Sequence, residues 1–217
     1  MLHAIGIDAV PICDGRSSGL VASSLGLKAT AETLGRAVIE DVQTSGVTEL
    51  LVLAPSDRWT FEYVYGNRLG LQWPTAVGVR EVTDVLAAAL ADGRLRLEPG
   101  ADDTPYAYHD PCHSARVAHE RPAPRALLAA ALGGAASREL FWREHRAHPC
   151  GAVGGLELTS PDIARQLAMA RLDAAQRTGA TTLITEDPGC LAHLARHSSA
   201  DVTVMGLYEL LADRLGR

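Results

Sequence analysis

An internal repeat constrains the fold of this chain more than any other feature of its sequence. Residues 46–57 (GVTELLVLAPSD) align without a gap on residues 179–190 (GATTLITEDPGC). Pro55 then matches Pro188, and Asp57 matches Cys190. In both copies a short apolar run leads into a turn that contains proline, and residues 79–90 align further on with residues 204–215. The repeat predicts an α/β fold with two pseudo-repeated halves, each with short parallel strands flanked by helices.

The apolar pattern along the chain adds the individual elements. It predicts short strands over residues 4–12, 50–53, 77–79, 106–108 and 182–185. It predicts helices over residues 30–44, 82–90 and 126–132, and a further helix that opens at Ser160 with Ile163, Leu167, Ala170 and Ala174 on its buried face. Residues 95–103, rich in Gly, Pro and Asp, form the best internal boundary. We therefore expect an N-terminal half over residues 1–100 and a C-terminal half over residues 101–217.

Residues 58–73 contain half of the aromatic side chains of the chain. A helix packed on a sheet and an exposed surface for a partner both explain such a cluster. The packed helix is favoured, because large aromatic side chains are mostly buried.

Composition excludes several classes of protein. The chain has 20 Lys and Arg against 26 Asp and Glu, and its net charge of −6 argues against binding nucleic acid through overall charge. No apolar run reaches the length of a membrane span, and the first residues lack the pattern of a secretory signal. We expect a cytoplasmic protein, in which cysteines are thiols, metal ligands or catalytic groups rather than disulfides.

Three of the four cysteines lie in turns at nearly equal intervals. Cys112 lies in the run YHDPCHSAR, Cys150 in PCGAVGG and Cys190 in DPGC. Soft thiolate ligands held on three loops indicate a metal or cluster site. The alternatives without a bound cofactor are three unconnected buried thiols, or a fold that kept its thiols after losing its cofactor. The fourth cysteine, Cys13, is expected to pack against other side chains rather than to act as a metal ligand.

These motifs resemble the cysteine-rich CCG-domain family, which includes a subunit of heterodisulfide reductase and the iron–sulfur subunits of glycolate and lactate oxidation systems. The family pattern is a lone cysteine in a His-Asp-x-Cys-His turn, an adjacent cysteine pair followed by glycine, and then Cys-x-x-Cys. Cys112, Cys150 and Cys190 match three of these five cysteines. The chain departs from the pattern at the other two, where Pro149 and Asp187 stand.

The resemblance implies an iron–sulfur cofactor. The three remaining cysteines suit a [4Fe–4S] cluster with one open or non-cysteine position, or a zinc ion. Asp187 offers a carboxylate oxygen, and His148 is the preferred fourth protein ligand; His109 and His113 are either ligands or donors to a thiolate. Gly151, Gly154 and Gly155 are expected to cradle a cluster through backbone N–H groups.

The function favoured is that of an iron–sulfur electron-transfer protein, a degenerate member of the CCG family. Its partners would be other redox subunits, and a small thiol or hydroxy acid is a candidate ligand. Whether it is itself an enzyme, for example as a subunit of an oxidoreductase complex, is left open. One alternative is a zinc-binding or metal-free assembly protein, and another is an enzyme that uses Cys112 or Cys190 as nucleophile.

Overall fold

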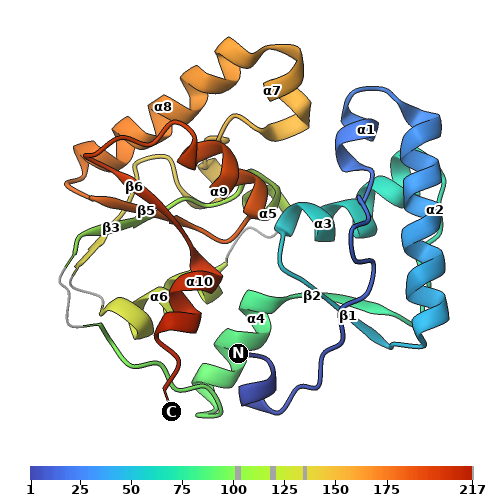
Figure 1. Cartoon of the computed structure of the whole chain (residues 1–217), viewed down its shortest axis with the longest axis horizontal. Coiled ribbons are helices and arrows are strands. Elements are labelled where there is room, and N and C mark those ends of the chain that lie inside the picture. Colours follow the sequence, from blue (N-terminus) through green and yellow to red (C-terminus); the bar gives the residue numbers. More distant parts are fainter. Residues whose placement is uncertain (101–103, 118–120, 134–135, 217) are drawn as a thin grey trace.

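The structure is a computed structural model, and it describes residues 1–100, 104–117, 121–133 and 136–216. The strands in these residues form two separate sheets, and each sheet is parallel (Figure 1). One sheet pairs β1 (Glu49–Val52) with β2 (Gly78–Glu81). The other has the order β4-β3-β5-β6, with β4 (Ser137–Arg138), β3 (Tyr106–Tyr108), β5 (Thr182–Thr185) and β6 (Thr203–Gly206). The predicted α/β class is confirmed.

The predicted repeat corresponds to two strand–helix units with the same order of elements. β1 leads into α3 (Pro55–Trp59) and β5 leads into α9 (Pro188–Ala195), each helix with proline in its first turn. Proline is tolerated there because its missing N–H would have no partner inside the helix. The next strands, β2 and β6, lead into α4 (Val82–Ala91) and α10 (Leu207–Asp213). Asp57 and Cys190 thus occupy equivalent positions in α3 and α9.

Helices cover both faces of the four-stranded sheet. α8 (Pro161–Arg177) and α9 pack on one face, where small side chains such as Ala168 and Ala175 contact Ala107 and Leu183 of the strands. α6 (Pro122–Leu132) and α10 pack on the other face, together with α4 from the first half (Figure 1). Because α4 belongs to this core, the two halves share buried apolar surface. The division into domains near residue 100 stays a prediction.

The first half has a smaller core of its own. It is formed by α2 (Lys28–Ser45), β1 and η2, a π-helix over Thr60–Leu69 that continues from α3. Phe61 and Tyr65 are buried there, and the ring of Phe61 stacks on that of Trp73 with centroids 4.9 Å apart. The aromatic segment therefore packs mainly inward, as the favoured interpretation predicted.

The remaining elements are short. They are η1 (His3–Ile5), α1 (Leu20–Ser24), α5 (Cys112–Val117), η4 (Glu144–Arg146), η5 (Val153–Gly155) and α7 (Leu156–Thr159). The strand predicted over residues 4–12 is wrong: η1 ends at Gly6, which has a left-handed backbone, and the chain then runs without regular structure. Of residues 4–12 only Ile5 is buried, and none of them lies in a strand.

Two helices differ from their predictions. α6 begins at Pro122 rather than at residue 126, because both Pro122 and Pro124 fall in the first turn, where no internal N–H donor is needed. On α8 the predicted face is wrong by one position: Ile163 is 53% exposed, whereas the buried residues are Ala164, Ala168, Arg171, Leu172 and Ala175. Small alanines let α8 approach the sheet closely, and a buried arginine lies among them.

The predicted connector over residues 95–103 is only partly described, because residues 101–103 lie outside the described residues. Leu95 is buried, and Leu97 forms an antiparallel bridge with Leu215. This part of the connector packs against the C-terminal end of the chain.

Candidate metal centre

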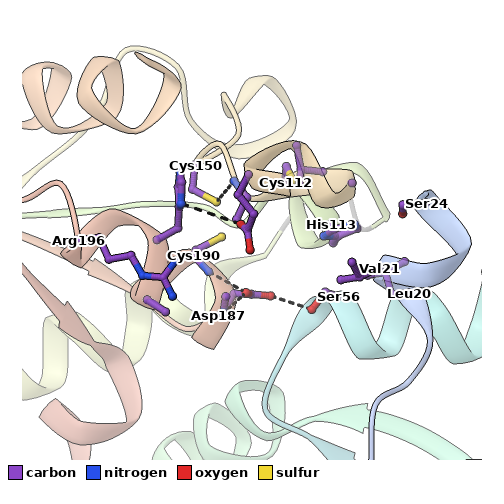
Figure 2. A pocket seen from close by; sticks show the side chains of 17 residues that line it. Leu20, Val21, Ser24, Ser56, Cys112, His113, Cys150, Asp187, Cys190 and Arg196 are labelled. Carbon is purple, nitrogen blue, oxygen red and sulfur yellow. Dashed lines mark hydrogen bonds and ion pairs between the residues drawn. The ribbon is translucent and has the colours of Figure 1, made fainter. Parts of the chain in front are cut away.

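The three predicted cysteines meet in one cavity. Cys112 opens α5 after β3, Cys190 lies in the first turn of α9 after β5, and Cys150 precedes η5. β3 and β5 are neighbours in a parallel sheet, so their carboxyl ends deliver Cys112 and Cys190 to the same edge. All three cysteines line a cavity of about 210 Å³ and are 2–7% exposed (Figure 2). The four cysteines of the chain, all among the described residues, form no disulfide.

Cys150 and Cys190 form a close pair. A hydrogen bond with Cys190 lowers the pKa of the Cys150 thiol, and the backbone N–H of Ala152 donates to Cys150 Sγ at 3.5 Å. The same hydrogen bond, followed by burial, raises the pKa of Cys190 well above its ordinary value. Thiolates are the form in which cysteines bind metals.

His109 lies beside two of the thiols. A ring nitrogen of His109 and the sulfurs of Cys150 and Cys190 all lie within 4.8 Å of one another. The side chain is fully buried, and burial together with the charge of Arg171 lowers its pKa well below the ordinary value. The imidazole is therefore neutral. Its Nδ1 accepts a hydrogen bond from Arg171 Nε at 3.2 Å, and its Nε2 has no hydrogen-bond partner in the described part of the chain.

His148, the preferred fourth ligand from sequence, does not line the cavity. Its exposed ring stacks on Trp142, with centroids 4.7 Å apart. The structure thus brings His109, and not His148, to the cysteine pair. Both histidines lie next to a cysteine motif in the sequence. Their sequence positions alone therefore did not show which one would lie beside the cysteine pair.

Asp187 lines the cavity, and it also caps α9. Its Oδ1 accepts hydrogen bonds from the backbone N–H groups of Gly189 at 2.9 Å and Cys190 at 3.1 Å. Its Oδ2 accepts one from Ser56 at 3.0 Å (Figure 2). Such a cap satisfies N–H groups that the helix itself leaves unpaired. Asp187 therefore holds the turn that carries Cys190, and its role as a metal ligand stays a prediction.

The three glycines of the Cys150 loop all have a left-handed backbone. A side chain on Gly151 would overlap the carbonyl oxygen of Ala164, and one on Gly155 would come within 3.0 Å of Leu25. These two glycines let the loop pack closely on its neighbours. Gly154 is the glycine of the three that lines the cavity, so it remains the best candidate for backbone contact with a ligand.

Several residues of the site were not predicted from sequence. Leu20, Val21 and Ser24 of α1, together with Ser56 of α3, close the cavity from the side of the first half (Figure 2). The side chain of Arg171, on α8, is 2% exposed and interacts electrostatically with both Cys150 and Cys190. Arg171 is one of several charged residues on α8, and the face of α8 was assigned from its apolar residues.

These residues fit a metal centre bound by sulfur. The donor set is three thiols with a neutral imidazole beside two of them, which suits iron–sulfur clusters and zinc. Burial lowers the pKa of Arg171 to about 10, so it is still a cation at neutral pH. This buried cation would offset the negative charge of metal-bound thiolates, because its Nη2 has no hydrogen-bond partner among the described residues.

Comparison with known families agrees with this donor set. Residues 106–195 match the CCG family, described as a cysteine-rich domain. This segment of the chain is similar in sequence to the CCG domain. The match covers β3 to α9 and includes all three cavity cysteines.

Individual relatives extend the similarity over most of the chain. It is 28% identical over 189 residues to a subunit of dihydromethanophenazine:CoB–CoM heterodisulfide reductase from Methanosarcina barkeri, covering 86% of this chain and 45% of that protein. It is 28% identical over 139 residues to a subunit of fumarate reductase (CoM/CoB) from Methanothermobacter marburgensis (62% and 27% covered). It is 32% identical over 87 residues to lactate utilization protein A of Shouchella clausii (40% and 35% covered). The chain spans less than half the length of these relatives.

A membrane-spanning helix is not found in the described residues, since none of their helices combines the necessary length and apolar character.

Proposed function

We propose that this chain binds an iron–sulfur cluster at Cys112, Cys150 and Cys190 and transfers electrons within a larger redox complex. The observation that carries the proposal is the convergence of three buried thiols, from three separate loops, on one cavity. Such a cluster, when bound, supplies one-electron transfer at a potential set by the charge and hydrogen bonds around it. The relatives named as subunits of heterodisulfide reductase and fumarate reductase support the same role.

The cluster we propose is [4Fe–4S]. Three cysteines are one fewer than the four that usually hold it, so one position is open or is filled by a group other than cysteine. The protein contributes the three thiolates, the cap at Asp187 that orients Cys190, and walls from α1 that limit the access of water. Limited access protects a cluster and lowers the local dielectric.

The open side of the cavity suits a small thiol or hydroxy acid. Apolar side chains of Leu20, Val21 and Val153 line it together with Arg196 and His193. A cationic side chain at the rim would pair with the carboxylate or thiolate of such a ligand. Other redox subunits are the proposed partners, because a single cluster needs a donor and an acceptor of electrons.

A zinc site is the second candidate, and one observation favours it. Two thiols and an imidazole nitrogen lie within 4.8 Å of one another, and zinc commonly takes this mixture of ligands. In that case the chain would be an assembly protein without redox chemistry.

Reconstitution of the purified protein with iron and sulfide under anaerobic conditions tests the proposal. We expect the broad visible absorbance of an iron–sulfur cluster in the wild type and its loss in Cys150→Ser. Cys13→Ser is the matched control, because Cys13 contacts the backbone of Val38 in the first half and does not line the cavity. Equal loss in both variants, or tight zinc binding that excludes iron, would contradict the proposal.

A further inference from the structure

Arg171 fixes the orientation of His109 by a contact that metal-bound histidines do not usually make. Its Nε donates to His109 Nδ1 at 3.2 Å, and its Nη1 donates to the carbonyl oxygen of Trp142 at 2.9 Å. A guanidinium has only donors, so His109 Nδ1 must be the acceptor. A neutral imidazole has one N–H and one lone pair, and the lone pair is at Nδ1. The hydrogen of His109 is therefore on Nε2.

The Nε2 of His109, which has no hydrogen-bond partner among the described residues, is thus a donor. A histidine that binds a metal through Nε2 presents a lone pair there and donates its Nδ1–H to a carboxylate or carbonyl. His109 shows the reverse arrangement, because the group at its Nδ1 is the cation of Arg171. Binding a metal through Nε2 in this arrangement would require the imidazole to lose its remaining hydrogen.

The guanidinium of Arg171 also has one nitrogen that is not hydrogen-bonded within the described residues. Its Nη2 is buried and has no hydrogen-bond partner among the described residues. A buried guanidinium N–H without a partner is costly unless a ligand completes it. Three groups act on the charge of Arg171: Asp110, Cys150 and Cys190. Asp110 already pairs with Arg125 at 2.8 Å, which leaves the two cysteines as the candidates for a counter-charge.

We propose that Arg171 is a positioning residue that makes His109 an Nε2–H donor to the sulfur of a bound cluster, rather than a metal ligand. In addition, Arg171 is the buried cation that offsets the negative charge of the cluster and its thiolates. This inference rests on the proposed iron–sulfur function and assigns the histidine in it. It follows that the fourth iron position is not filled by His109. Hydrogen-bond donors and positive charge near the sulfurs stabilise the reduced cluster, because reduction makes the cluster more negative.

The tautomer of His109 can be measured without any cofactor. Nitrogen NMR of metal-free protein labelled at histidine distinguishes Nε2–H from Nδ1–H. We expect His109 in the Nε2–H form in the wild type, and an Nδ1–H tautomer would overturn the inference. This readout does not depend on cluster loading, so it separates failure of the inference from failure of the proposed function.

In the loaded protein, pulsed EPR of the reduced cluster tests whether a histidine nitrogen is bound to iron. We expect only the weak nitrogen coupling of a hydrogen-bond donor, and a directly coordinated histidine nitrogen would overturn the inference. This measurement uses the wild type, so it does not depend on a variant that folds.

The reduction potential tests the role of Arg171. We expect Arg171→Met to weaken the preference for the reduced cluster about tenfold, which is a fall of about 59 mV for a one-electron couple. Arg171→Lys keeps the charge and should restore part of the shift. Arg165→Met is the matched control, because Arg165 is an exposed arginine on the same helix. Loaded Arg171→Met with the potential of the wild type would overturn this assignment.

Discussion

Ser56 Oγ donates a hydrogen bond of 3.0 Å to Asp187 Oδ2 and so joins α3 of the first half to the capped end of α9 in the second. The two residues stand at nearly equivalent places in the repeat, each beside the proline that opens its helix. The contact lies at the edge of the cysteine cavity. The two halves thus meet where the metal centre is expected, and the first half takes part in it without supplying a cysteine.

The cap at Asp187 gives a prediction that separates capping from metal binding. Asp187→Asn keeps an oxygen for the N–H groups of Gly189 and Cys190, and Asn caps helices about as well as Asp. We expect Asp187→Asn to retain cofactor binding and stability. Asp187→Ala should lose about 1 kcal/mol of unfolding free energy, measured by urea denaturation. A loss of bound metal in Asp187→Asn as severe as in Asp187→Ala would instead make the carboxylate a ligand.

Gly151 should tolerate no side chain. Its φ of 109° is unfavourable for other residues, and a Cβ would overlap Ala164 O and lie 2.8 Å from His193 Nε2. We expect Gly151→Ala to lower the free energy of unfolding by about 3 kcal/mol or more and to displace Cys150. Gly154→Ala is the control, because its Cβ would meet nothing within 4 Å. That variant should lose only about 1 kcal/mol through its positive φ. Equal losses would show that backbone conformation, and not close packing, explains both glycines.

Glu186 predicts a pH dependence of stability. Burial raises its pKa to about 7, although Arg121 Nη1 lies 3.5 Å from its Oε1. The folded state therefore holds a proton that the unfolded state releases near its ordinary pKa of about 4.3. The stabilisation from this proton is complete below about pH 4 and is lost as the pH rises towards about 7, by an amount on the order of 3 kcal/mol.

Unfolding of the metal-free protein in urea at about pH 5 and about pH 8 measures this effect. Glu186→Gln mimics the protonated carboxyl, so it should remove part of the pH dependence and stabilise the protein at the higher pH. Burial also raises the pKa of Glu81, which lies 2.5 Å from Arg121 Nη1, so some dependence in the same direction should remain. An unchanged slope in Glu186→Gln would mean that Glu186 is ionised in the folded state.

The repeat explains why much of the fold was predictable from sequence. Pro55 and Pro188 mark the first turn of a helix after a short strand, and both strands pair in parallel with the strand that follows their helix. Cys112 and Cys190 follow neighbouring strands, so their meeting followed from topology. The prolines act through local backbone rules, which sequence patterns carry directly.

The parts that the sequence patterns did not resolve depend on side-chain direction. His109 and His148 both adjoin a cysteine motif, but one follows a buried strand and the other stacks on Trp142 at the surface. On α8 the buried face is set by close approach to the sheet and by the contact of Arg171 with His109, and neither is visible in hydrophobic periodicity. The apolar run after η1 was predicted as a strand, but its residues are not buried and none of them lies in a strand.

The most direct test of the account is the iron and acid-labile sulfide content of the wild-type protein, purified without oxygen and without reconstitution. We expect about four iron and four sulfide per chain, as in a [4Fe–4S] cluster, with both lost in Cys150→Ser and retained in Cys13→Ser. Stoichiometric zinc without sulfide, or protein without iron that still fails to bind it when iron and sulfide are supplied, would contradict the assignment of Cys112, Cys150 and Cys190 to an iron–sulfur cluster.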